Sequence, residues 1–268
     1  MNPSQADWAL ITGASKGLGL AFAQLLAKQG QNLILISLPG ENLAATAASL
    51  IGQFGVKALT VEVDLTTSEG RNRVVETIDK EVARLGCLVN NAGIGRNAAF
   101  GEEAYAFHKS VIDLNIQSTM ALTYALLPLL ERSRPSRIIT IASLAAFQPM
   151  PLFATYAASK AFLKSWGLAL GAELAPLGIV STVVAPGGIY TNDEVRAQVR
   201  AQGLGGYLST QEPEEVARIA LAASERGKSL VIPGAFNRIL AVLGSLVPDE
   251  LKAKAVYTRW KKAATCRS

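Results

Sequence analysis

Short apolar runs alternate along the chain with longer segments of helical periodicity. The runs are nearly continuous rather than alternating between apolar and polar residues, as expected for strands that helices cover on both faces. Seven runs predict strands over residues 8–12, 32–37, 58–64, 87–90, 137–142, 180–185 and 230–233. Helices are predicted between them, over residues 17–29, 41–54, 68–85, 102–131, 155–175 and 213–226. This order indicates an α/β fold with a doubly wound, seven-stranded parallel sheet.

The amino-acid composition indicates a folded, globular protein rather than a disordered one. Half of the 268 residues are hydrophobic and 18% are charged, far more apolar than a disordered chain. No linker, charge block or internal repeat divides the chain. We therefore expect a single domain over residues 1–235, followed by a helical, basic C-terminal extension over residues 236–268.

The histidine and cysteine content excludes several kinds of chemistry. His108 is the only histidine, and Cys87 and Cys266 are the only cysteines. These counts exclude a multi-histidine metal site, a cysteine-rich zinc site and a disulfide framework, so we expect no bound metal. A Ser-His-Asp hydrolase would depend on His108, and no Gly-x-Ser-x-Gly elbow precedes it. We expect Cys87 to be a buried structural thiol.

A glycine-rich loop follows the first predicted strand. Gly13, Gly17 and Gly19 lie between that strand and a helix of apolar periodicity. Glycine lets the backbone turn tightly and approach a ligand, and free N–H groups at a helix N-terminus attract a pyrophosphate. Glycines also serve ordinary strand–helix turns, and the spacing is G-x-x-x-G-x-G rather than G-x-G-x-x-G. Its position directly after the first strand favours dinucleotide binding.

The residues after the second predicted strand bear on the choice of dinucleotide. An NAD-binding protein commonly places a carboxylate there to accept a hydrogen bond from the ribose 2′-hydroxyl. This chain has Ser-Leu-Pro-Gly over residues 37–40, and its first carboxylate is Glu41. Lys16, in the glycine-rich loop, could instead pair with a 2′-phosphate. The sequence favours NADP(H), and NAD stays possible.

A serine, a tyrosine and a lysine suggest acid–base chemistry. Ser143 follows the fifth predicted strand, and Tyr156 and Lys160 share one face of the next helix because four residues separate them. An ammonium near a phenol favours the phenolate, so we expect Lys160 to lower the pKa of Tyr156 from about 10. Ser143 could then hold a substrate carbonyl while Tyr156 exchanges a proton with it. Taken singly, Tyr156 and Lys160 are better explained as an ordinary amphipathic pair.

Together these motifs resemble the short-chain dehydrogenase/reductase family, near its hydroxysteroid dehydrogenase and ketoacyl reductase branch. The resemblance spans residues 8 to 233, and the residues that carry it are Thr12, Gly13, Gly17, Gly19, Asn90, Asn91, Ala92, Gly93, Asn115, Ser143, Tyr156, Lys160, Pro186, Gly187 and Gly188. It implies a Rossmann-type fold and an oxidoreductase that uses a nicotinamide cofactor.

The resemblance also implies a role for each site residue. Tyr156 would be the general acid in reduction, and Lys160 would tune it and bind the nicotinamide ribose. Ser143 would orient the carbonyl, and Asn115 would hold a water of the proton relay. The cofactor would contact a larger set: Gly13, Ser15, Lys16, Gly17, Leu18, Gly19, Ser37, Asp64, Asn91, Ala92, Gly93, Tyr156, Lys160, Pro186, Gly187, Ile189 and Thr191. Leu38 departs from the pattern, because NADP-preferring members usually carry an arginine there.

The substrate side of the site is apolar. Residues 147–153 would lie at the pocket mouth and suit an apolar ketone, such as a 3-oxoacyl or steroid-like carbonyl. Alternatively, they pack against residues 189–210, whose glycines suggest a mobile lid. The sequence therefore predicts an NADPH-dependent oxidoreductase that reversibly reduces a ketone or aldehyde to an alcohol. The alternative is a catalytically silent NADP(H)-binding regulatory or scaffold protein, which we would expect to lose the acid–base pair retained here.

The extension is basic and carries an apolar face. Residues 249–268 hold six Lys/Arg against two Asp/Glu, a net charge of +4 that leaves only +1 for residues 1–248. Apolar residues recur at helical spacing over residues 236–247. Two interpretations are open: packing against a neighbouring subunit, which we favour, and peripheral contact with an anionic membrane.

Location and partners follow from the same features. The sequence shows no secretory signal and no membrane-spanning run, so we expect a cytoplasmic protein. The nearly neutral body argues against a nucleic-acid partner. The family resemblance implies a homodimer or homotetramer formed through the helices that contain Asn115 and Tyr156.

Overall fold

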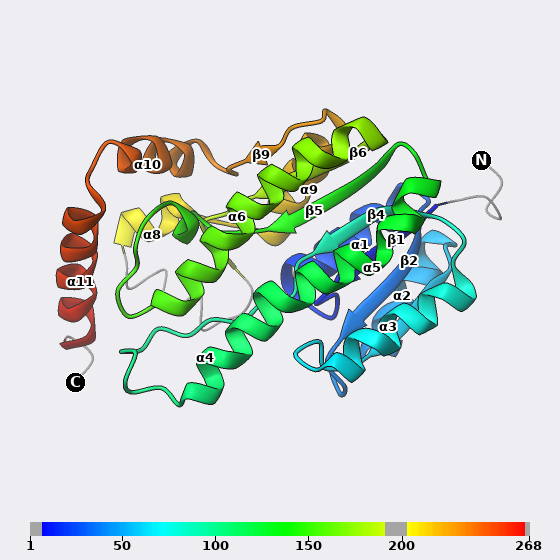
Figure 1. Ribbon diagram of the computed structural model, residues 1–268, viewed down its shortest axis with the longest axis horizontal. Coiled ribbons are helices and arrows are strands. Elements are labelled where there is room, and N and C mark those ends of the chain that lie inside the picture. The colour runs from blue at the N-terminus through cyan, green and yellow to red at the C-terminus, as the bar shows by residue number, and fades with distance from the viewer. Residues whose placement is uncertain (1–6, 191–202, 266–268) are drawn as a thin grey trace.

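A parallel sheet forms the centre of the molecule (Figure 1). The computed structural model describes residues 7–190 and 203–265, and within them seven strands pair in the order β3-β2-β1-β4-β5-β6-β9. The strands are β1 (Trp8–Thr12), β2 (Asn32–Ser37), β3 (Ala58–Glu62), β4 (Leu85–Asn90), β5 (Ser136–Ile141), β6 (Ile179–Val184) and β9 (Leu230–Val231). The predicted doubly wound parallel sheet is confirmed.

Helices cover both faces of the sheet. The helices of the described residues are α1 (Gly17–Lys28), α2 (Leu43–Phe54), α3 (Ser68–Glu81), α4 (Tyr105–Ile112), α5 (Thr119–Arg132), α6 (Ala154–Leu174), α8 (Gly203–Ser209), α9 (Pro213–Glu225), α10 (Ala235–Ser245) and α11 (Asp249–Thr265), of which α1, α2 and α9 cover one face and α3 and α5 the other. A short parallel pair, β7 (Gly188–Ile189) with β8 (Thr210–Gln211), lies apart from the main sheet.

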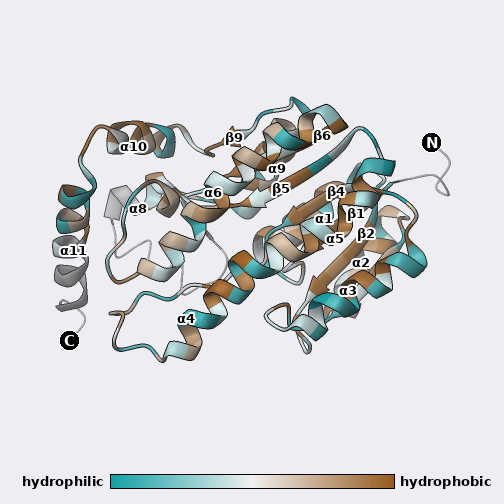
Figure 2. Cartoon of the chain, in the orientation of Figure 1, coloured by the Kyte–Doolittle hydropathy of each residue, from teal (hydrophilic) through white to brown (hydrophobic). Residues whose placement is uncertain are grey.

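Two apolar layers hold the helices to the sheet. Successive strand residues point to opposite faces, so Ile11 packs with α1, α2 and α9, whereas Leu10 packs with α3 and α5. Figure 2 shows the apolar central strands in brown. Burial on both faces explains why the strand sequences are continuous apolar runs.

The predicted elements differ from the observed ones mainly at their ends. The helix predicted over residues 68–85 ends at Glu81, because Val82 is extended and Leu85 already begins β4 opposite Trp8. Its start is as expected, since the Thr67 hydroxyl accepts a hydrogen bond from the N–H of Gly70. The segment predicted as one helix over residues 102–131 begins at Tyr105 and contains a π-helix between α4 and α5.

Parallel strands bring their carboxyl ends to one edge of the sheet. Thr12 ends β1, Asn90 ends β4, and Ser143 follows β5 two residues after its end. These three strands are neighbours in the sheet, so the motifs that follow them converge.

The last two helices, α10 and α11, lie at the end of the molecule opposite α2 and α3 (Figure 1). None of the helices in the described part of the chain is long and apolar enough to cross a membrane.

Candidate active site

The glycine-rich loop is fastened to the loop that follows β4. The Thr12 hydroxyl accepts hydrogen bonds from the backbone N–H groups of Asn91 and Ala92, both at 2.9 Å. The Asn91 side-chain amide in turn donates to the carbonyls of Thr12 at 2.8 Å and Gly13 at 3.2 Å. Sequence analysis placed both motifs at the cofactor, and these bonds explain how they are held together.

Close backbone packing explains two of the glycines in this loop. Gly13 has a φ of +68°, which favours glycine, and a Cβ on Gly19 would overlap the Gly13 carbonyl. Gly17 begins α1, and the side chain of Leu18 is buried in the core. The N-cap residue of α1 is Lys16, whose ammonium has no acceptor atom with which to cap the first turn, so the N–H groups of that turn are left as donors for an anion. The residues therefore fit a dinucleotide pyrophosphate.

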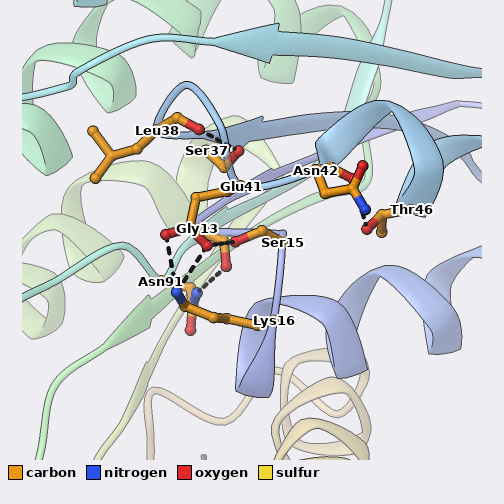
Figure 3. Close-up of polar contacts among 9 residues, drawn as sticks. All are labelled: Gly13, Ser15, Lys16, Ser37, Leu38, Glu41, Asn42, Thr46 and Asn91. Atoms are coloured by element: carbon orange, nitrogen blue, oxygen red, sulfur yellow. Dashed lines mark hydrogen bonds and ion pairs between the residues drawn. The ribbon is translucent and has the colours of Figure 1, made fainter.

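Lys16 has an acidic partner (Figure 3). Its Nζ lies 2.9 Å and 2.8 Å from the two carboxylate oxygens of Glu41, and the Ser15 hydroxyl donates to the same carboxylate at 3.3 Å. The hydrogen bond from Lys16 is the main cause that lowers the pKa of Glu41. Sequence analysis noted Glu41 as the first carboxylate after β2 but missed this pairing, because 25 residues separate the two side chains.

The predicted acid–base residues lie together after β5 and on α6. Ser143 is extended, and its hydroxyl accepts a hydrogen bond from the N–H of Ala145 at 3.1 Å. Tyr156 and Lys160 lie one turn apart on α6, and Lys160 Nζ is 5.6 Å from the centroid of the Tyr156 ring. Lys160 is almost fully buried and donates to the carbonyl of Ile141 at 2.8 Å. The predicted shared face of Tyr156 and Lys160 is confirmed.

Burial controls the protonation of this pair. Desolvation raises the pKa of Tyr156, and a hydrogen bond with Ser143 opposes that shift. Desolvation also lowers the pKa of Lys160 to about 8. The expectation that the pKa of Tyr156 is lowered is therefore wrong for this structure, because removal of the phenolate from water outweighs the opposing contribution of Ser143. Tyr156 is a neutral phenol at pH 7 and can donate a proton.

Asn115 lies in the π-helix Asp113–Ser118 and is fully buried. Its side-chain amide donates to the Ile94 carbonyl at 3.0 Å and to the Ser159 hydroxyl at 2.9 Å, and its Oδ1 accepts from the Ile94 N–H at 2.9 Å. Asn115 thus links the loop after β4 to α6. π-Helical turns are frequent at functional sites, and sequence analysis missed this one within a longer predicted helix.

Two glycines of the loop after β4 lie against the catalytic side chains. A Cβ on Gly93 would lie 3.1 Å from Asn115 Oδ1 and 3.2 Å from Lys160 Nζ. A Cβ on Gly95 would overlap the ring of Tyr156. Gly93 belonged to the predicted site, whereas Gly95 was missed. The only signal for Gly95 in the sequence was its position, two residues after the end of the Asn-Asn-Ala-Gly motif.

The other predicted cofactor residues are spread along the carboxyl edge of the sheet. Ser37 is buried at the end of β2, and Asp64 follows the edge strand β3, where its carboxylate accepts from the N–H of Thr66. Pro186 and Gly187 follow β6, and Ile189 ends β7. Thr191 lies outside the described residues, as does most of the predicted lid over residues 189–210.

A small cavity of about 30 Å³ opens beside Tyr156. Leu152 and Phe153 line it, and Phe153 stacks on the Tyr156 ring with 4.3 Å between ring centroids. This part of the predicted apolar mouth therefore faces the site. Phe147 instead packs with the buried cluster around Val183.

The single histidine joins two walls of that cavity. His108 Nδ1 lies 2.9 Å from the Thr155 hydroxyl, and Nε2 lies 3.0 Å from the Phe100 carbonyl. His108 thus connects the loop before α4 to the residue that precedes Tyr156. Sequence analysis gave this histidine no role.

Among the described residues, neither the thiol of Cys87 nor a cluster of metal ligands adds to the site. Cys87 is buried in β4, and burial raises its pKa to about 11, as expected for a structural thiol. No group of three or more possible metal ligands occurs among the described side chains.

Residues 7–202, which contain these motifs, match the family model described as short chain dehydrogenase. The chain belongs to the short chain dehydrogenase family. This short chain dehydrogenase is 33% identical over 224 residues to the 3-oxoacyl-[acyl-carrier-protein] reductase of Aquifex aeolicus, covering 81% of this chain and 89% of that protein. It is 37% identical over 179 residues to a very-long-chain 3-oxoacyl-CoA reductase of Phaeosphaeria nodorum, covering 65% of this chain.

The alignment covers only 52% of that fungal protein, so the short chain dehydrogenase described here spans about half of its length. Among solved structures, L-sorbose reductase from Gluconobacter frateurii, in complex with NADPH and L-sorbose, superposes with a TM-score of 0.76 at 30% identity. That match covers 86% of this chain and 97% of the other. The similarity confirms the Rossmann-type fold and membership of an oxidoreductase family.

Proposed function

We propose that this short chain dehydrogenase is an NADPH-dependent carbonyl reductase that reversibly converts a ketone or aldehyde into an alcohol. The observation that carries the proposal is the Tyr156 phenol held one helical turn from the buried Lys160 ammonium, 5.6 Å from its ring centroid, with Ser143 at the carboxyl end of the neighbouring strand. A proton donor and a carbonyl-orienting hydroxyl at the carboxyl edge of a Rossmann-type sheet suit carbonyl reduction.

The cofactor in this proposal is NADP(H). The glycine-rich loop and the first turn of α1 would hold the pyrophosphate, and Lys16 and Ser37 would lie at the ribose phosphate. Asn91, Ala92, Gly93 and Lys160 would hold the nicotinamide end. When bound, the cofactor supplies the hydride that the carbonyl carbon receives. The NADPH complex of L-sorbose reductase supports this assignment.

Each side chain of the site then has a distinct task. The Ser143 hydroxyl donates a hydrogen bond to the carbonyl oxygen and so fixes its position. Tyr156 gives its phenolic proton to that oxygen as negative charge develops there. Lys160 carries a positive charge below its pKa of about 8 and stabilises the tyrosinate that remains. Asn115, bonded to Ile94 and Ser159, would position the water that returns the proton.

The substrate is proposed to be an apolar ketone, with a 3-oxoacyl thioester as the first candidate. Leu152 and Phe153 line the cavity beside Tyr156, and aromatic side chains of residues 100 and 107 complete it. The polar residues that also line it pair with one another, Arg96 with Glu103 and His108 with Thr155. The rest of the wall is apolar and favours an acyl chain over a sugar. The names of the bacterial and fungal relatives, both 3-oxoacyl reductases, point in the same direction.

A homo-oligomer and a cytoplasmic location are part of the proposal. Large side chains are exposed on α4, α5 and α6: Tyr105, Met120, Tyr124 and Phe162. Contact with a second copy through these helices would cover them. The competing function, a silent NADP(H)-binding scaffold, leaves the complete set of acid–base residues without a purpose.

The decisive experiment is a panel of carbonyl substrates assayed by consumption of NADPH and of NADH, with Tyr156→Phe as the matched variant. We expect reduction of apolar 3-oxo substrates with NADPH and a loss of kcat of about 10²–10⁴-fold in Tyr156→Phe, because the proton donor is gone. NADPH binding, measured by fluorescence titration, should be retained. Tight NADPH binding without turnover of any carbonyl or alcohol would favour the scaffold instead.

A further inference from the structure

An ordinary surface helix turns its large apolar side chains toward the body of the protein, whereas α10 exposes them to solvent. Asn237 and Ala241 are buried against the body, and the Asn237 amide donates to the carbonyls of Ser209 at 3.1 Å and Pro233 at 3.0 Å. The large aliphatic side chains Ile239, Leu240 and Leu243 are exposed on the opposite side. At 3.6 residues per turn, these three fall within an arc of about 100°.

The turn after α10 extends this exposed face. Leu246 and Val247 follow Leu243 at helical spacing, and Leu246 is 77% exposed whereas Leu243 is 56% exposed. We call Ile239, Leu240, Leu243, Leu246 and Val247 the apolar face. Contiguous exposed aliphatic side chains of this kind mark a surface that another apolar phase covers.

The positive charge of the chain is concentrated around the apolar face. Residues 226–268 contain nine Lys/Arg and two Asp/Glu, a net charge of +7. Since the whole chain has a net charge of +5, residues 1–225 carry −2. A cationic segment on an otherwise slightly acidic protein is a local feature with its own partner chemistry.

Described basic side chains lie both before and after the apolar face in the chain. Arg226, Lys228 and Arg238 line an open hollow of about 550 Å³ beside β9 and the start of α10. None of the ion pairs between described residues involves these three cations. After the apolar face in the chain, Lys254 is exposed on α11.

We propose that the apolar face and the cations before and after it dock the described part of the extension, residues 236–265, on the surface of an anionic phospholipid membrane. The aliphatic side chains would enter the boundary between headgroups and acyl chains, and the cations would contact lipid phosphates and carboxylates. No described helix can cross a membrane, so the extension lies on the surface. A second copy is a poorer occupant, because it would bring two segments of net charge +7 together.

Vesicle sedimentation of the full-length protein tests this proposal without any assay of activity. The probes are vesicles of phosphatidylcholine alone and of phosphatidylcholine with phosphatidylserine. We expect sedimentation with the phosphatidylserine vesicles only, weakening as salt is raised. Leu243→Glu with Leu246→Glu should reduce binding at least about tenfold, since two carboxylates must then enter the lipid boundary.

Two further variants complete the design. Ile51→Glu with Gln53→Glu adds the same two charges on exposed positions of α2 and should bind vesicles like the unmodified protein. Arg238→Gln with Lys254→Gln should weaken binding by about fivefold per charge removed. The two glutamine substitutions leave the apolar face intact. They test the proposal on their own if circular dichroism shows that Leu243→Glu with Leu246→Glu impairs folding.

Three results would overturn the proposal. One is the absence of sedimentation with phosphatidylserine vesicles. Another is equal binding of the Leu243→Glu, Leu246→Glu variant and the α2 control. The third combines two measurements: the unmodified protein does not bind vesicles, and the Leu243→Glu, Leu246→Glu variant has a lower molar mass by light scattering. That result would identify the face as a subunit interface.

Discussion

Lys16 and Glu41 hold opposite charges at the place where the ribose of a dinucleotide would be recognised. The Lys16 side chain is 72% exposed, so the pair contributes at most about 1 kcal/mol to stability. A 2′-phosphate carries more negative charge than one carboxylate and can take over the lysine. The Glu41 carboxylate then stays near the 2′-phosphate and repels it, because both are negative. We therefore expect the preference for NADPH over NADH to be weaker than Lys16 alone would give.

Glu41→Gln is therefore expected to tighten NADPH binding by about fivefold, the equivalent of about 1 kcal/mol, and to change NADH binding little. Lys16→Glu should act in the opposite direction and weaken NADPH far more than NADH. Dissociation constants from fluorescence titration measure both effects. Equal changes for the two dinucleotides would contradict a 2′-phosphate site at Lys16, and Glu69→Gln on α3 is a control of the same charge.

The buried ammonium of Lys160 illustrates a conflict between stability and function. Its pKa is about 8 in the folded protein and 10.5 in the reference state, so folding disfavours its charged form. Below pH 8 the lysine is charged in both states, and its burial destabilises the fold in full. Between pH 8 and 10.5 the folded state loses the proton first, and the destabilisation fades as pH rises.

Lys160→Met should consequently abolish turnover and yet stabilise the protein at pH 7. The shift corresponds to about 3 kcal/mol, and loss of the hydrogen bond to Ile141 offsets about 1 kcal/mol of it. Thermal denaturation between pH 7 and 10.5 should show a gain that shrinks with pH. Lys80→Met, on the exposed side of α3, should show no such dependence. A variant less stable at every pH would contradict this account.

At the scale of elements, the loop after β4 organises the site. Asn115 fixes Ile94 by donating to its carbonyl and accepting from its N–H, and Gly93 and Gly95 on either side of Ile94 allow the loop to pass over Lys160 and the Tyr156 ring. The π-helix supplies the asparagine from between α4 and α5. Three elements far apart in the sequence thus define the position of one phenol.

Gly95→Ala should displace that phenol. The added methyl group would overlap the Tyr156 ring, so we expect kcat to fall by about 10²-fold, as misplacement of a reacting group typically causes. Gly101→Ala is a matched control, because no heavy atom in the described part of the chain lies within 4 Å of its added Cβ. Steady-state kinetics of both variants measure the difference, and unchanged kcat in Gly95→Ala would refute the close contact.

At the scale of the whole molecule, two separate surfaces remain uncovered in one chain. The aromatic side chains on α4, α5 and α6 belong to the catalytic half of the protein, and the apolar face belongs to the cationic extension. Only the second is surrounded by concentrated positive charge, which is why we assign a second copy to the first surface and lipid to the other.

Met120→Arg with Tyr124→Arg should therefore lower the molar mass in solution to that of the monomer. Two cations on α5 would face their symmetry copies and repel them. Light scattering coupled to gel filtration measures the mass, and Ile51→Arg on α2 is the control for an exposed apolar residue. An unchanged mass would exclude α5 from the subunit interface.

Local pattern was sufficient to predict the seven strands, the glycine-rich loop and the shared face of Tyr156 and Lys160. Apolar runs, glycine spacing and separation by four residues are properties of neighbouring residues, and the backbone converts them directly into structure. The sequence also determined the cationic character of the extension.

The tertiary structure alone decided how these parts meet. It paired Lys16 with Glu41 across 25 residues, turned the large side chains of α10 outward and inserted a π-helix where the apolar pattern continues unbroken. It also reversed the expected pKa shift of Tyr156. Those outcomes depend on burial and on contacts between distant segments, because desolvation and close packing arise only when the chain is folded around each group.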